Sequence, residues 1–481
     1  MRLHKFLFIS LALILICASF AVAQPAPNRF EAAMELYRAS NFTGAVAELK
    51  AALQLSPDDP AVMNWLGFML MKTGQPAEAI TMLEKAVSKR QDMPDAYNNL
   101  GNAYLAKSRL KDAADAYQKS ITLNPKASGS RYNLANIYLK MDRLDDAVKQ
   151  YVAASELAPD DPSILNNLGY AYYLKSDWTQ ASAAYQKASV LSPGDPVVFL
   201  NMGMTYSKQG DWDKAIPALD KSATLDGSRY ATRMALGEAY ITKGNVESAV
   251  AQFQAAEAIK PSEFGPHYNL AVLYAKQGDY QRAADESKRA IEANPNDANS
   301  YNNLGWMYFV QKKYADARIQ FEKAIKLNKN LAVAHSNLAI TYQNLGKPDM
   351  AAASWREVER INPKSTTAAI SLGNILLASR KYNEAAAEYN KALALDPANA
   401  HAMNGLGLVA ERTNKLADAI KWYTKATTSN PKFAVGFNNL GLAFEKLEKK
   451  DFATANYKKA LEADPASQDA KTNLARLSAQ K

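Results

Sequence analysis

The sequence predicts an all-α solenoid, in which short antiparallel helix pairs stack one behind another along the chain. Three observations lead to this prediction. The sequence resembles itself at a fixed period of 34 residues, without insertion, from Ala26 to Ser467. Apolar residues within each period form two stripes with helical spacing, and proline recurs after the second stripe. Because a single helix pair cannot bury both stripes, neighbouring pairs must cover them.

The chain begins with a segment that has the three parts of a secretory signal. Arg2 and Lys5 give it a positive start, residues 6–20 form an apolar run, and Ala21-Val22-Ala23 offers small residues for cleavage. The apolar run is 15 residues long, whereas a membrane-spanning helix needs about 20. We therefore expect a signal peptide at residues 1–23, cleaved after Ala23, and a periplasmic or secreted mature protein. Retention of the segment as a membrane anchor is the alternative.

The single cysteine of the chain, Cys17, lies inside this signal segment. A lipoprotein signal would use it, but Ile16 is larger than the residue that precedes a lipoprotein cysteine. The mature protein would have no disulfide, no thiolate nucleophile and no cysteine-ligated metal. An exported protein without disulfides favours a double-membraned bacterium as the host.

Residues 24–25 form a short connection, and residues 26–467 divide into thirteen repeats, numbered here from position 1 at Ala26. Position 20 is alanine in every repeat, from Ala45 to Ala453, and position 8 is always glycine or alanine. Positions 4, 7, 8 and 11 form the stripe of a first helix, and positions 20, 24 and 27 that of a second. We expect the small residue at position 8 to face the alanine at position 20, so that the helices approach closely. Proline at position 32 ends the second helix in ten repeats.

Residues 468–481 continue the frame for one more first helix. Leu474 and Ala475 extend the apolar stripe, while Asp469, Lys471 and Arg476 are charged. One apolar and one polar face are what the end of a stack of helices requires. This segment is therefore predicted to be a C-terminal capping helix.

The pattern closely resembles the tetratricopeptide repeat. Residues 99–104 read Asn-Leu-Gly-Asn-Ala-Tyr, and Ala113, Tyr117 and Pro125 follow at the positions that this family prefers. His267 and His335 depart from the pattern at position 4, where the family often has tryptophan. The resemblance covers nearly all of the mature chain. It implies a right-handed superhelix whose first helices line a concave groove.

The sequence offers no constellation of residues that suits catalysis. The mature chain has three histidines: His267 and His335 occupy a packing position, and His401 stands apart from both. Paired acids such as Asp145-Asp146 and Asp160-Asp161 fall at turns and helix starts, where carboxylates cap backbone amides. We therefore predict a protein that is not an enzyme and uses no metal or cofactor. A formal net charge of +9 over 481 residues is too dilute to indicate nucleic-acid binding.

The face of the first helix opposite its packing stripe, at positions 2, 6, 9 and 13, is the candidate binding groove. Side-chain amides both donate and accept hydrogen bonds, so a row of asparagines suits the backbone of an extended peptide. Large apolar residues at position 9 would receive its side chains, and cations at position 13 would favour acidic ones. The candidate residues are Asn99, Asn133, Asn167, Asn201, Asn269, Asn303, Asn337 and Asn439 at position 6, Tyr170 and Trp306 at position 9, and Lys140, Lys208 and Lys276 at position 13.

The residues on this face also have a purely structural interpretation. Asparagine at position 6 and lysine at position 13 are common in the family that the chain resembles. A cation also suits a helix C-terminus, and the next superhelical turn could cover position 9.

The sequence as a whole predicts a scaffold that binds extended peptide segments of partner proteins, in cell-envelope assembly or export. No nucleic acid, small-molecule substrate or integral membrane segment is expected once the signal is removed. The alternative is a structural spacer of an envelope complex, such as one for exopolysaccharide secretion, which would contact partners through its ends or its convex face.

Overall fold

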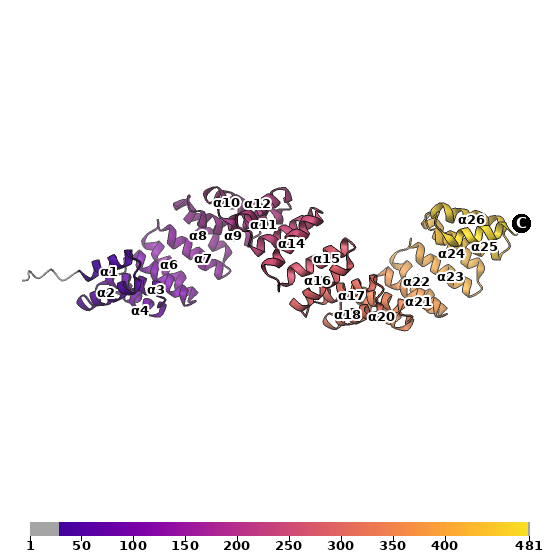
Figure 1. The fold of residues 1–481 in the computed structure, drawn as a ribbon, viewed down its shortest axis with the longest axis horizontal. Coiled ribbons are helices and arrows are strands. Elements are labelled where there is room, and N and C mark those ends of the chain that lie inside the picture. The colour runs from indigo at the N-terminus through magenta and orange to yellow at the C-terminus, as the bar shows by residue number, and fades with distance from the viewer. Residues whose placement is uncertain (1–27, 480–481) are drawn as a thin grey trace, which may run out of the picture. The chain divides into compact units, whose positions relative to one another are not determined.

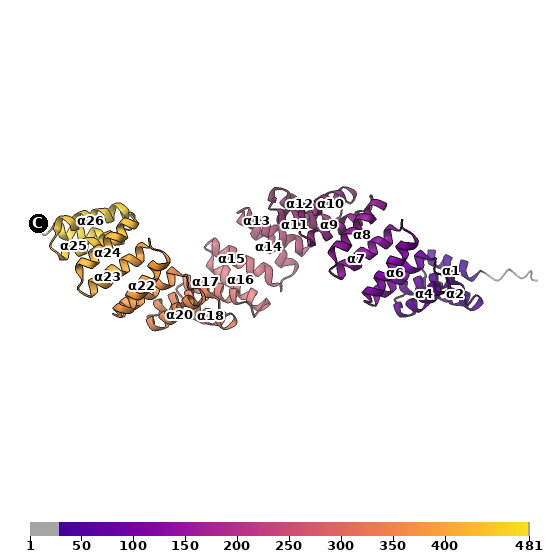
Figure 2. The ribbon, with the colours of Figure 1, turned by 180° about the vertical axis from the view of Figure 1, so that it is seen from behind.

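The computed structural model describes residues 28–479 as helices joined by short turns, without a strand in that part of the chain. The predicted signal and residues 24–25 lie outside the described residues. The chain divides into two compact units, one ending at Gly227 and the other beginning at Ser228. Consecutive helices follow one another through each unit (Figures 1 and 2). Among the described residues, none of the helices combines the length and apolarity that a membrane crossing requires.

The helices alternate between a first and a second helix of each pair. The first unit contains α1 (Arg29–Arg38), α2 (Phe42–Leu55), α3 (Pro60–Lys72), α4 (Pro76–Lys89), α5 (Pro94–Ala106), α6 (Leu110–Leu123), α7 (Ser128–Lys140), α8 (Leu144–Leu157), α9 (Pro162–Leu174), α10 (Trp178–Leu191), α11 (Pro196–Gln209) and α12 (Trp212–Leu225). The second unit contains α13 (Tyr230–Thr242), α14 (Val246–Ile259), α15 (Phe264–Lys276), α16 (Tyr280–Ala293), α17 (Ala298–Val310), α18 (Tyr314–Leu327), α19 (Ala332–Asn344), α20 (Pro348–Ile361), α21 (Thr366–Ala378), α22 (Tyr382–Leu395), α23 (Ala400–Arg412), α24 (Leu416–Ser429), α25 (Ala434–Lys446), α26 (Lys450–Ala463) and α27 (Gln468–Ser478).

Carboxylates and prolines fix where many first helices begin. The Asp59 side chain accepts a hydrogen bond from the Ala61 amide at 2.8 Å, and Asp161 accepts one from the Ser163 amide at 2.9 Å. Proline follows each of these caps, where its missing N–H costs nothing. The acids at these helix starts are therefore structural, as the sequence indicates. Asp145 and Asp146 instead form ion pairs with Lys175 and Arg143.

The turn inside every helix pair places position 15 of the repeat in the left-handed backbone region. Glycine occupies it in five pairs, with φ between 68° and 82°. In the other eight pairs an L-residue adopts φ near 60°: Ser40, Ser108, Asp142, Ser176, Lys312, Arg380, Asn414 and Glu448. A side chain is strained in this conformation because its Cβ crowds the following carbonyl oxygen.

Replacing Lys312 by glycine should therefore stabilise the α17–α18 pair by up to about 1 kcal/mol, the difference between the relieved strain and the entropy that glycine loses. Hydrogen exchange of the α17 and α18 amides measures the effect, as slower exchange. The neighbouring Lys313 has φ −83°, so Lys313→Gly is the matched control and should speed exchange. Equal losses of protection in both variants would contradict the strain argument.

Small residues at position 8 allow the two helices of a pair to pack closely. The residue that lies against position 8 differs from the alanine at position 20 that the sequence predicts. The alanines at position 20 are fully buried. The atoms nearest to a Cβ added at position 8, however, belong to the large side chain at position 24. A Cβ on Gly101 would lie 2.6 Å from the Tyr117 ring, and one on Gly407 would lie 2.4 Å from the Tyr423 ring. The expectation that position 8 faces position 20 is therefore wrong in its main contact, because the position-24 side chain spans the interface and reaches the glycine.

Within each unit, consecutive first helices contact one another directly, as α3 does with α5 and α17 with α19. Consecutive second helices make no comparable contact in the described part of the chain. Each unit therefore curves locally with its first helices on the inner side. The last helix, α27, packs on α26 and buries Ala470 and Leu477, whereas Ala475 is exposed. It lies where the capping helix is expected, with its apolar stripe turned slightly from the predicted one.

Candidate protein-binding face

The first-helix face, defined as positions 2, 6, 9 and 13 of the first helices, holds the asparagines singled out in the sequence. Their amides bond to the preceding helix pair. Asn99 Nδ2 donates to Asn64 Oδ1 at 3.0 Å, and Asn337 Nδ2 donates to Asn302 Oδ1 at 3.0 Å. Asn133, Asn201 and Asn439 donate in the same way to Asn98, Asn166 and Asn404. We call this row the asparagine ladder; each rung joins position 6 to position 5 one repeat earlier.

Three candidate asparagines depart from the ladder where position 5 of the preceding repeat is not asparagine. Asn167 donates to the Tyr132 hydroxyl at 2.9 Å, and Asn269 donates to the Gly265 carbonyl of its own helix at 3.0 Å. The residue at position 5 of the repeat before Asn303 is Tyr268, and its ring packs against Phe264. Among the eight candidates in the described chain, Asn303 alone makes no side-chain hydrogen bond.

The ladder changes what the asparagines can offer to a ligand. An asparagine side chain has two amide hydrogens and a carbonyl oxygen. One hydrogen is used in each rung, so the second hydrogen and the oxygen of the position-6 residue stay available. The rungs also hold these groups in fixed orientations before any partner arrives, which lowers the entropic cost of binding.

Large apolar side chains on this face are open to solvent. Tyr170 is 44% exposed and Met204 36% in the first unit, and Val272 is 43% and Trp306 38% exposed in the second. The Trp306 ring stacks on Phe309 with 5.2 Å between ring centroids. Exposing such side chains to water is unfavourable, and covering them with a partner protein contributes strongly to the free energy of binding.

The three candidate lysines lie in the last turns of first helices, and their side chains are exposed. Lys140, Lys208 and Lys276 belong to α7, α11 and α15. None of them has an ion-pair partner among the described residues. Lys446 of α25 differs, because it pairs with Glu411 at 2.5 Å. The three lysines therefore add uncompensated positive charge beside the exposed apolar residues.

A set of position-9 asparagines on this face was not foreseen from the sequence. Asn102 and Asn374 accept hydrogen bonds from the hydroxyls of Tyr117 and Tyr389, both at 2.7 Å. Asn136 accepts one from Tyr151. The sequence does contain a pattern that indicates these bonds: every repeat with asparagine at position 9 has tyrosine at position 24. Burial raises the pKa values of these tyrosines, so their hydroxyls stay protonated donors.

Two charged clusters lie between second helices, away from the first-helix face, and the buried His267 of the first helix α15 belongs to one of them. In one, His267 Nδ1 lies 2.7 Å from Glu286, His267 Nε2 lies 2.8 Å from the Pro261 carbonyl, and Arg289 contacts both Glu257 and Glu286. Carboxylate and imidazole groups at this spacing could hold a metal ion. Both imidazole nitrogens are already engaged, however, and Arg289 balances the carboxylates, so the arrangement fits an ion-pair network better.

The second cluster repeats this arrangement three pairs later. Lys391 contacts Glu359 at 2.8 Å and lies beside Glu388. Burial and the nearby Glu359 carboxylate raise the pKa of Glu388. Ala369 stands where the first cluster has His267, so no imidazole takes part in the second cluster.

Comparisons with known proteins agree with this repeat geometry. Family models described as tetratricopeptide repeat match residues 36–103, 298–331, 336–399, 370–432 and 435–467. The chain is a tetratricopeptide-repeat protein. A model described as the C-terminal domain of cilia and flagella-associated protein 70 matches residues 82–304 of this tetratricopeptide-repeat protein. A search of curated proteins finds no match.

Two solved structures match most of the chain at low similarity. The "APC/C hetero-tetramer Cut9-Hcn1" structure matches with a TM-score of 0.39 and 13% identity, covering 92% of this chain and 95% of that one. Yeast Tom70 matches with a TM-score of 0.37 and 17% identity, covering 88% of this chain and 96% of that one. Tetratricopeptide-repeat proteins generally mediate protein–protein interactions, and this tetratricopeptide-repeat protein has the all-α architecture of that class.

Proposed function

We propose that this tetratricopeptide-repeat protein binds extended, partly apolar and acidic segments of partner proteins on its first-helix face. The observation that carries the proposal is the exposure of Tyr170, Met204, Val272 and Trp306 on that face, with unpaired lysines beside them. The asparagine ladder supports it, because its free amide and carbonyl groups suit a peptide backbone. Binding would be non-enzymatic.

The signal pattern at residues 1–23 supports a place in the bacterial periplasm or outside the cell, with cell-envelope assembly or export as the process. A structural spacer is the second candidate. Leu55 and Val190, which are 77% and 79% exposed on second helices, favour it, because they offer apolar contacts away from the first-helix face.

The test compares two variants that remove similarly exposed apolar side chains from the same helix pair. Trp306→Ala removes a residue of the first-helix face, and Ile319→Ser removes one from α18, where Ile319 is 40% exposed. Neither residue forms a ladder rung. The readout is binding to an array of extended peptides that vary in apolar and acidic content, together with crosslinking in the envelope fraction.

We expect Trp306→Ala to weaken peptide binding at least tenfold, the loss typical of an aromatic anchor, while Ile319→Ser leaves it unchanged. Circular dichroism should be the same for both. Two results would replace the proposed function with the spacer function. One is that the peptides bind neither the parent protein nor the variants. The other is that only Ile319→Ser loses its crosslinked partners.

A further inference from the structure

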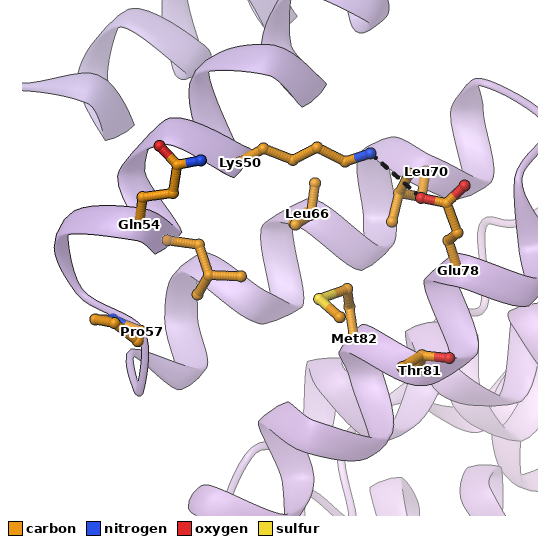
Figure 3. Close-up of a pocket in the computed structure, with 9 residues that line it drawn as sticks. Lys50, Gln54, Pro57, Leu66, Leu70, Glu78, Thr81 and Met82 are labelled. Atoms are coloured by element: carbon orange, nitrogen blue, oxygen red, sulfur yellow. Dashed lines mark hydrogen bonds and ion pairs between the residues drawn. The ribbon is translucent and has the colours of Figure 1, made fainter.

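A pocket of about 510 Å³ opens between the second helices α2 and α4, with α3 forming its floor. Leu66 and Leu70 of α3 lie at the bottom, and Met82 of α4 forms one wall (Figure 3). Across it, Lys50 Nζ reaches Glu78 Oε2 at 3.2 Å. The pocket is therefore apolar within and carries one ion pair at its edge. It lies on the second-helix side, apart from the first-helix face.

The pocket lies at one of the five repeats that have no tyrosine at position 11. Position 11 is tyrosine in eight repeats, whereas the second repeat has Leu70 there. In four of these eight repeats, the tyrosine ring is buried and its hydroxyl forms a hydrogen bond with the side chain twenty residues earlier. Tyr104 bonds to Glu84 at 2.7 Å, and Tyr342 bonds to Glu322 at 2.8 Å. At two other junctions the direction is reversed, because Gln186 Nε2 donates to the Tyr206 hydroxyl and Gln254 Nε2 donates to the Tyr274 hydroxyl.

The residue twenty positions before Leu70 is Lys50, which leucine is too short and too apolar to meet. Lys50 turns to Glu78 instead. The junction between α18 and α20 offers a comparison, because Tyr342 is present there and the hollow that it lines is smaller, about 340 Å³. Lysine is compatible with a tyrosine in this arrangement: Lys288 stands twenty residues before Tyr308, and the two interact electrostatically.

We propose that this pocket binds a p-hydroxyphenyl ring, supplied as a tyrosine side chain by a partner protein. The ring would take the place that Tyr104 and Tyr342 fill at their junctions. It would lie against Leu66, Leu70 and Met82. Its hydroxyl would lie near Lys50 and Glu78, which can donate to it and accept from it. A pocket of this size accepts the ring together with the backbone that carries it. The site does not depend on peptide binding at the first-helix face.

The experiment uses the full chain with methyl-labelled methionine, because the Met82 methyl group reports on the pocket directly. The probes are p-cresol, which is the tyrosine side chain alone, and N-acetyl-tyrosinamide, which adds backbone. We expect both to shift the Met82 methyl resonance, with intermolecular contacts between ring protons and that methyl group. A dissociation constant on the order of 1 mM is expected for so small a ligand.

The matched variant is Leu70→Tyr, which introduces the side chain that eight other repeats have at position 11. It should weaken p-cresol binding at least tenfold and leave the helical content unchanged. If this variant does not fold, Met82→Trp fills the pocket from its other wall, as Trp422 stands at the same position of a later repeat, and saturation transfer then reads binding from the ligand side.

Two outcomes would overturn the proposal. One is the absence of a Met82 shift with p-cresol at about ten times the expected dissociation constant. The other is binding of p-cresol without binding of N-acetyl-tyrosinamide, which would show that the pocket cannot take a ring carried on a protein backbone.

Discussion

Replacing Tyr423 by alanine should destabilise the second unit by about 3–5 kcal/mol, the cost of deleting a buried aromatic ring. The Tyr423 side chain is fully buried on α24, and its ring fills the space over Gly407. Its hydroxyl donates to Glu411 Oε2 at 2.8 Å, and Glu411 in turn pairs with Lys446 of the next helix pair. The substitution thus opens a cavity inside one pair and loosens its link to the following one.

Urea unfolding followed by circular dichroism measures the loss, and hydrogen exchange locates it at α23 and α24. Tyr423→Phe is the control, because it keeps the ring and removes only the hydrogen bond to Glu411. Burial raises the pKa of Tyr423, so the hydroxyl is a donor at neutral pH and the control should cost about 1 kcal/mol. Similar losses in both variants would show that the hydrogen bond, and not ring packing, stabilises the pair.

Replacing Ala317 by leucine should cost about 1–3 kcal/mol, because the larger side chain would force apart helices that are already in contact. Ala317 is fully buried on α18 and packs in the same core as Phe321, which lies under Gly305. A lower urea midpoint and faster exchange in α17 and α18 are the expected results.

The matched control for this substitution is Ala315→Leu on the same helix, where the alanine is exposed. It adds the same atoms and should change stability by less than about 0.5 kcal/mol. A melting curve for Ala317→Leu that matches the control would place the packing stripe of this repeat at other residues.

The fold could be predicted because its main determinants recur. The period of 34 residues, the buried alanine at position 20 and the helix-ending proline appear so often that the all-α solenoid follows from the sequence. The error about position 8 has a specific cause. Spacing shows that Gly407 must be small, but not whether Ala419 or Tyr423 approaches it, since both lie on the same stripe.

The candidate site could be predicted less fully. Helical spacing places position 6 away from the packing stripe, and this predicts that the Asn337 amide is available to a ligand. Spacing describes one helix at a time, so it does not show that Asn337 bonds to Asn302 of the preceding pair. The pocket could not be predicted for the same reason. Leu70 is an ordinary apolar residue in its own helix, and the pocket becomes apparent only when Lys50 and Glu78 of the neighbouring helices are placed beside it.

The asparagine ladder is interrupted at the start of the second unit, and this has a mechanical consequence. Neither Asn269 nor Asn303 bonds to position 5 of the pair before it, so α13, α15 and α17 are joined without these rungs. Hydrogen bonds between neighbouring helices resist sliding and bending more steeply than apolar contacts do, because they depend on angle as well as distance. The junctions from α19 to α23 also lack rungs, because Ser371 and Gly405 occupy position 6 there. Under tension, both stretches should therefore extend more readily than the run from α3 to α7, where Asn99 and Asn133 form rungs.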